Sequence, residues 1–144
     1  MVNAEIQTLS EPDGTPVTNV AFDLSRDQLA AASHALGDVM LERHRGHSLE
    51  IDDVLALREL SGVRDEVERL AGAGGHASIL MTLGRFIALH DAVDEWVQSR
   101  HDRGWGREAD DEAMPYLGAM LGPMADLRGR ALTATLGGSE ATSG

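Results

Sequence analysis

One histidine–carboxylate pair in the second half of the chain has a spacing that could hold a metal ion. His90 and Asp94 are four residues apart in a segment with helical periodicity, so their side chains lie on one side of the predicted helix. Imidazole nitrogen and carboxylate oxygen are both ligands of divalent metals. Completing such a site would require carboxylates from another helix, for which the candidates are Asp110, Asp111 and Asp126. The alternative interpretation is that His90 lies at the boundary between the core and the surface and only pairs with Asp94.

Two other groups of histidines have simpler interpretations. His34 and Asp38 repeat the four-residue spacing but are predicted to point away from the apolar stripe of their helix, as a solvated ion pair. His44 and His47 flank Gly46, a residue that often ends a helix. We therefore interpret the charged stretch "ERHRGHSLEIDD" as a joint between two helices, with cations closing the first and carboxylates opening the second.

The usual signatures of catalysis and of cofactor binding are absent from the sequence. There is no cysteine, and no serine has the G-x-S-x-G setting of a nucleophile elbow. The run "GAGG" lacks the lysine of a phosphate-binding loop and the glycine spacing of a dinucleotide turn. The sequence therefore favours a protein without catalytic activity and without a cofactor.

Charge limits the partners that can be expected. The chain has 24 acidic residues against 12 basic ones, all of them arginine, for a net charge of −12. Such a surface repels phosphate backbones and anionic membranes, so neither nucleic acid nor membrane is expected as a partner. The sequence also lacks a signal-peptide pattern and any apolar run of the about 20 residues that a membrane span requires. We expect a cytoplasmic protein, and the lysine-free composition indicates a high-GC or salt-adapted, bacterial genome.

The N-terminal part predicts strands followed by a helix. Alternating residues indicate short strands near 6–9 and 20–24, separated by the turn residues "EPDGTP". Ser25 and Gln28 have the spacing of a capping box that opens a helix, with Leu24 and Leu29 placed to pack across it.

Three further helical regions follow, at about 48–71, 84–103 and 110–136. "SG" at 61–62 is predicted to split or bend the first of these, and Pro123 to kink or break the last. The predicted apolar face of 48–71 consists of Val54, Leu57, Leu60, Val63, Val67 and Leu70.

The segment 77–83 can be a strand or the start of the helix that follows it. A weak repeat decides for the strand, because strand–helix–helix patterns recur about 60 residues apart. The fold class predicted is mainly α (α+β): about four helical regions with a small sheet from the N-terminal strands and 77–83, and a possible internal duplication. Residues 1–136 are predicted to form one globular domain and 137–144 a flexible tail.

These features predict a small, acidic interaction or regulatory module. The alternatives are a metal-binding bundle or metal-dependent enzyme that uses His90 and Asp94, and an acidic inhibitor that mimics nucleic acid. The expected partner is a second copy, and possible further partners are other proteins. The free edges of a small sheet, and helices with more apolar surface than that sheet can cover, predict a homodimer. Its interface would be 77–83 or the Met-rich face of 114–124; the alternative for the Met-rich face is a place in the core.

Overall fold

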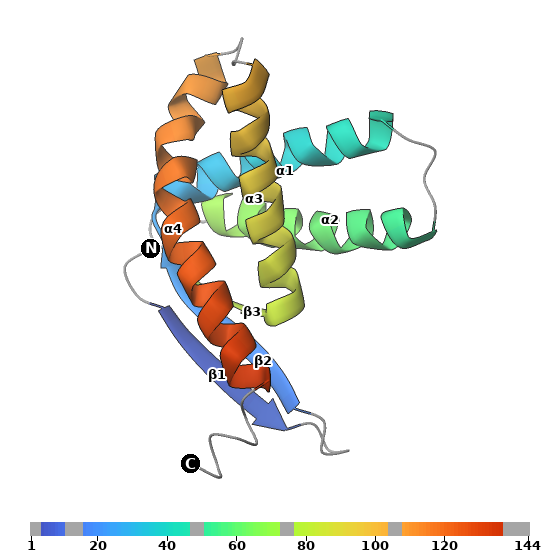
Figure 1. Cartoon of the computed structure of the whole chain (residues 1–144). Helices are drawn as coiled ribbons and strands as arrows, with labels where there is room; N and C mark the ends of the chain where they lie inside the picture. Colours follow the sequence, from blue (N-terminus) through green and yellow to red (C-terminus); the bar gives the residue numbers. More distant parts are fainter. Residues whose placement is uncertain (1–3, 11–15, 47–50, 73–76, 104–107, 137–144) are drawn as a thin grey trace.

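The computed structural model describes residues 4–10, 16–46, 51–72, 77–103 and 108–136. These residues form four helices and a three-stranded antiparallel sheet (Figure 1), which confirms the predicted fold class. The elements in chain order are β1 (Ala4–Ser10), β2 (Pro16–Leu24), α1 (Arg26–Gly46), α2 (Ile51–Gly72), β3 (Ala77–Thr82), α3 (Leu83–Arg103) and α4 (Glu108–Leu136).

The central strand of the sheet is β2, which pairs antiparallel with β1 on one side and with β3 on the other. Val20 and Phe22 are buried on the face that the helices cover, while Ala21 between them is only partly buried. The predicted N-terminal strands are therefore confirmed, with longer bounds. The turn predicted between them falls mainly on 11–15, outside the described residues.

The segment that the sequence left open between strand and helix is the strand β3. Ile79 and Met81 are 2% and 7% exposed, opposite Phe22 and Val20 of β2. Leu80 lies on the other face and is 57% exposed. The described helices therefore cover only one face of this strand.

The start of α1 is fixed by the capping box that the sequence predicts. The backbone N–H of Ser25 donates to Oε1 of Gln28 at 3.0 Å, and the N–H of Gln28 donates back to the Ser25 hydroxyl at 3.2 Å. Leu24 and Leu29, on either side of the cap, are fully buried. Two backbone donors are thereby satisfied where the strand turns into the helix.

Neither of the two predicted helix breaks occurs. The helix α2 runs unbroken through Ser61 and Gly62, and α4 runs unbroken through Pro115 and Pro123. Pro123 is exposed, so the carbonyl that it leaves without an N–H partner faces water. The axis of α4 curves along its length instead of breaking (Figure 1).

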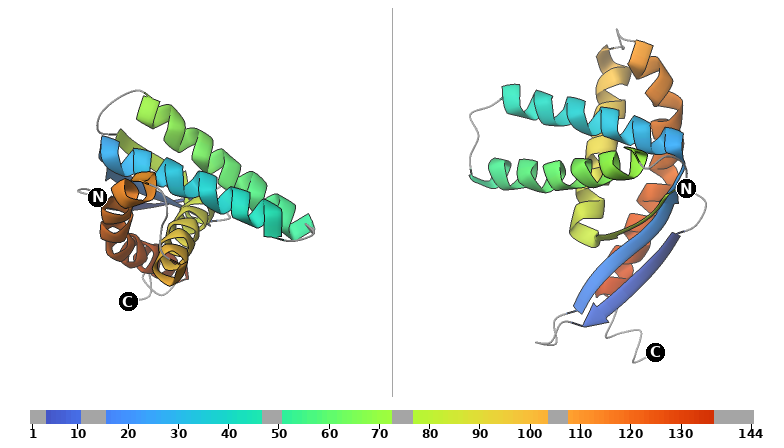
Figure 2. Two further views of the ribbon diagram at one scale, coloured as in Figure 1. Left: turned by 90° about the horizontal axis from the view of Figure 1, so that it is seen from above. Right: turned by 180° about the vertical axis from the view of Figure 1, so that it is seen from behind.

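The helices α1 and α2 form an antiparallel hairpin. Ser33 donates to Glu68 at 3.2 Å, and one turn further along α1 Gly37 lies against the Arg64 side chain, with a would-be Cβ 3.1 Å from its Nη2. A glycine at 37 therefore leaves the space through which this guanidinium passes. The far end of the hairpin projects sideways beyond α3 and α4 (Figures 1 and 2).

The Met-rich face of α4 belongs to the core of the chain itself. Met120 and Met124 are fully buried, because α4 packs against α1, α3 and the sheet. Phe22 and Phe86 meet edge to face in the same core, with ring centroids 5.3 Å apart. The prediction that this face could be a dimer surface is corrected, since Met120 and Met124 are covered within the chain and Met114 is partly buried against the same core.

Both halves of the chain place a strand directly before a pair of helices, as β2–α1–α2 and β3–α3–α4. The internal duplication itself stays a prediction. None of the described helices has the length and apolarity that crossing a membrane requires.

Replacing Met124 with alanine is expected to lower the free energy of unfolding by about 2–4 kcal/mol, because the cavity left in a packed core costs more than the lost transfer energy. Urea denaturation measures this. Leu132→Ala, at a position 36% exposed on the same helix, is the control and should cost under about 1 kcal/mol. Equal losses in the two variants would contradict the assignment of the Met-rich face to the core.

Candidate functional site

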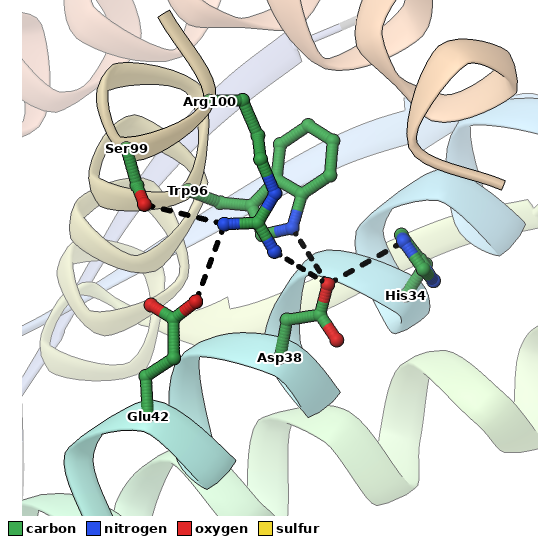
Figure 3. Close-up of polar contacts among 6 residues, drawn as sticks. All are labelled: His34, Asp38, Glu42, Trp96, Ser99 and Arg100. Atoms are coloured by element: carbon green, nitrogen blue, oxygen red, sulfur yellow. Dashed lines mark hydrogen bonds and ion pairs between the residues drawn. The ribbon is translucent and has the colours of Figure 1, made fainter. Parts of the chain in front are cut away.

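The most concentrated set of polar side chains lies where α3 crosses α1 (Figure 3). Its centre is Asp38 of α1, whose Oδ2 accepts hydrogen bonds from Nε1 of Trp96 at 3.0 Å and from Nη2 of Arg100 at 2.9 Å. Trp96 is fully buried and the Arg100 side chain is 10% exposed. A carboxylate of α1 is thus bound by two donors that stand one helical turn apart on α3.

The second terminal nitrogen of the Arg100 guanidinium makes two further contacts. This nitrogen, Nη1, donates to Glu42 and to the Ser99 hydroxyl, each at 3.2 Å. The guanidinium carbon also lies 4.9 Å from the centroid of the Trp96 ring, a distance typical of a cation–π contact. The buried positive charge therefore has two carboxylates and an aromatic face around it, as a charge removed from water requires.

His34 stands at the edge of this cluster. Its Nε2 lies 3.5 Å from Oδ2 of Asp38, and its ring meets Trp96 edge to face at 5.7 Å. The sequence correctly predicts the pair of His34 with Asp38 but is wrong about its solvation, since the two side chains are only 23% and 15% exposed. The helix that covers them, α3, begins about 45 residues further along the chain, where no local pattern of α1 can reveal it.

The arrangement of these groups is that of a structural clamp between two helices. One oxygen of Asp38 faces His34, Trp96 and Arg100 together, so its charge is committed to contacts inside the protein. A catalytic base or nucleophile has to face a substrate. We name this set of residues the α1–α3 clamp: His34, Asp38, Glu42, Trp96, Ser99 and Arg100.

A small hollow opens beside His34, between α1 and α4. Asp27, Glu112 and Tyr116 contribute its polar groups, and the Tyr116 hydroxyl lies 3.4 Å from Oδ2 of Asp27. Its volume of about 190 Å³ is below the about 300 Å³ at which small-molecule sites begin. The hollow does not by itself indicate a substrate.

The predicted metal ligands lie on α3, away from the clamp. His90 is partly buried, and its Nδ1 lies 3.2 Å from Nη1 of Arg128, which also donates to Asp91 at 2.6 Å. Asp94 is exposed on the same helix. A guanidinium beside Nδ1 opposes a cation there, and no group of three potential ligands occurs within the described residues. The metal site stays a prediction, and the positive charge beside Nδ1 of His90 disfavours it.

The other candidate ligands do not gather around His90. Asp126 pairs with Arg130 at 3.7 Å on the exposed side of α4. The side chains of His101, Asp110 and Asp111, like residue His47, lie outside the described part of the chain.

The charged stretch at 42–53 lies where one helix ends and another begins, as the sequence predicts. α1 ends at Gly46 and α2 starts at Ile51. Arg43 pairs with Glu95 of α3 at 3.1 Å, and His44 is exposed.

A second candidate site is the outer side of α2, which the sequence analysis missed. The inward side of this helix carries Leu60, Val63 and Val67, all at most 1% exposed. At about 100° per residue, Ile51 lies half a turn around the helix from Leu60, and Leu55 about 140° from it. Both therefore point away from the core.

Three apolar side chains form this outer surface. Ile51, Leu55 and Val54 are 77%, 53% and 43% exposed. Val54 was predicted to lie on the buried face of this helix. That prediction is wrong, because the first turns of α2 extend past the body of the protein and leave Val54 exposed. We name Ile51, Val54 and Leu55 the α2 outer patch. The spacing of Ile51 and Leu55, four residues apart and opposite Leu60, is the signal that could have revealed it.

Comparison of the chain with protein-family models, with curated proteins and with solved structures finds no match.

Removing the positive charge of the α1–α3 clamp is expected to destabilise the fold. Arg100→Met leaves Asp38 partly buried without its main partner, for which the expected loss is about 3 kcal/mol of unfolding free energy. The matched control is Arg130→Met, which removes an exposed ion pair and should cost under about 1 kcal/mol. Chemical denaturation measures the free energy of unfolding of both variants. Losses of equal size would show that the α1–α3 clamp does not stabilise the fold in this way.

The titration of His90 predicts a pH dependence of stability. Burial and then the Arg128 guanidinium lower the pKa of His90 from its ordinary value of 6.5. Below pH 6.5 the unfolded chain therefore holds more protons than the folded one, so the free energy of unfolding should fall as pH drops through 6.5 towards the lower folded pKa. Above 6.5 this contribution to stability is fully present.

Urea denaturation at a series of pH values measures this effect in the wild type, His90→Gln and Arg128→Gln. The part of the pH dependence that arises from His90 should vanish in His90→Gln and shrink in Arg128→Gln, which removes only the second cause. Identical profiles for the wild type and His90→Gln would show that the prediction is wrong.

Proposed function

We propose that this chain is a non-catalytic protein–protein interaction module that binds through the α2 outer patch. The observation that carries the proposal is the exposure of Ile51, Val54 and Leu55 together on the outer side of one helix. Single exposed apolar side chains are normal on soluble proteins, but contiguous ones mark interaction surfaces.

The fold of the chain gives the α2 outer patch no role of its own. The packing of α2 is supplied by its inward side, where Leu60, Val63 and Val67 are buried. An amphipathic helix requires only one such stripe. The patch therefore adds apolar area to water without stabilising the described fold, as expected of a surface that is covered in a complex.

The position of the patch also suits docking. It lies at the far end of the α1–α2 hairpin, which projects beyond α3 and α4 (Figure 2). A projecting helix can lie against a groove or another helix without a clash from the rest of the molecule, and anchors spaced as in Ile51 and Leu55 are typical of such helix-mediated recognition.

We propose no catalytic role, because the side chains of the α1–α3 clamp bind one another and thereby hold two helices together. Asp38, Trp96 and Arg100 satisfy one another between two helices, and the hollow beside His34 is small. The alternative of an acidic nucleic-acid mimic rests on net charge alone, which solubility also explains.

Replacing Leu55 with glutamate is expected to abolish complex formation, with the chain itself or with another protein, because it places a charge within the α2 outer patch. Leu136→Glu is the control, since Leu136 is 79% exposed at the far end of α4. Size-exclusion chromatography of purified protein and affinity capture from the source cells are the measurements, with circular dichroism to verify folding. Complexes that survive Leu55→Glu as well as they survive Leu136→Glu would overturn the proposal.

A further inference from the structure

We infer that the partner of the α2 outer patch is a second copy of this chain, which docks as an antiparallel α2–α2 pair about a two-fold axis at Leu55. This inference rests on the proposed function and names its partner. The homodimer is thereby assigned to a surface different from both of those that the sequence suggested.

With such an axis, an acidic residue near Leu55 of one copy lies level with a basic residue of the other copy. Asp52 lies three residues before Leu55, and Arg58 lies three residues after it. In an antiparallel pair centred on Leu55, Arg58 of one copy therefore stands level with Asp52 of the other, about 4.5 Å along the axis from the centre. Asp52 and Arg58 lie about 60° to either side of Leu55 around the helix, so the long Arg58 side chain has to reach across the interface towards Asp52 of the other copy. The two-fold axis places two such pairs in each dimer.

Two other arginines of α2 have ion-pair partners within the same helix. Arg64 pairs with Glu68 at 3.1 Å and Arg69 with Glu66 at 2.8 Å, both within α2. Within the described part of the chain, neither Asp52 nor Arg58 forms an ion pair, and both are exposed. Among the described residues, Arg58 is thus a cation without an ion-pair partner, beside an apolar patch on a protein of net charge −12.

The two dimer surfaces that the sequence suggested expose less apolar area than the α2 outer patch. The Met-rich face is buried within the chain. Among the described residues of β3, only Leu80 is an exposed large apolar side chain. The α2 outer patch offers three apolar side chains and complementary charges on one helix.

The test is a charge exchange across the proposed axis, using Arg58→Asp, Asp52→Arg and the double variant. Light scattering coupled to gel filtration should report twice the 15.4 kDa chain mass for the wild type at micromolar concentration. Each single variant places like charges opposite each other, so the dissociation constant should rise about tenfold or more. The double variant restores opposite charges and should recover wild-type affinity to within about threefold.

The possible results separate this inference from the proposed function. A monomeric wild type overturns the inference, and so does a double variant that stays as weak as the single ones. If the wild type is monomeric but captures another protein in a manner that Leu55→Glu abolishes, the proposed function stands and only the second copy is wrong. A dimer that neither Leu55→Glu nor the charge variants weaken refutes both.

Discussion

The buried contact of Asp38 with Arg100 and Trp96 is the constraint on which the arrangement of the helices depends. A carboxylate and a guanidinium that are mostly withdrawn from water must stay paired, because separating them leaves charges without solvent or partner. Their geometry therefore fixes the point at which α3 crosses α1. Apolar packing alone is less directional, so we infer that the polar contact favours this crossing over other ways of packing the same apolar faces.

This crossing determines what the rest of the molecule can cover. With α1 held against α3 and α4, the helix α2 can only pack along the side of α1, where Gly37 leaves space for Arg64. The middle of α2 reaches α3, where Glu59 pairs with Arg85 at 3.5 Å. Its first turns extend beyond the body of the protein, which is why apolar side chains at 51–55 remain outside.

Much of this fold could be predicted from local sequence, because local interactions determine it. The capping box of Ser25 and Gln28 and the core role of Met120 and Met124 follow from spacing alone. The clamp could not be predicted, since Asp38 and Arg100 are far apart in sequence. The exposure of Leu80 and Val54 depends likewise on which neighbours the tertiary fold supplies. The candidate site was missed because the apolar residues of α2 were assigned to one face when they occupy two.

The most direct test of a two-fold contact at Leu55 uses the fact that the chain contains no cysteine. In a Leu55→Cys variant the two thiols would meet at the axis, within the about 7 Å between Cα atoms that a disulfide spans. Mild oxidation should convert this variant to a covalent dimer, while Ala125→Cys, exposed on α4, should stay monomeric under the same conditions. Crosslinking of both variants at equal rates, or of neither, would contradict the proposed assembly.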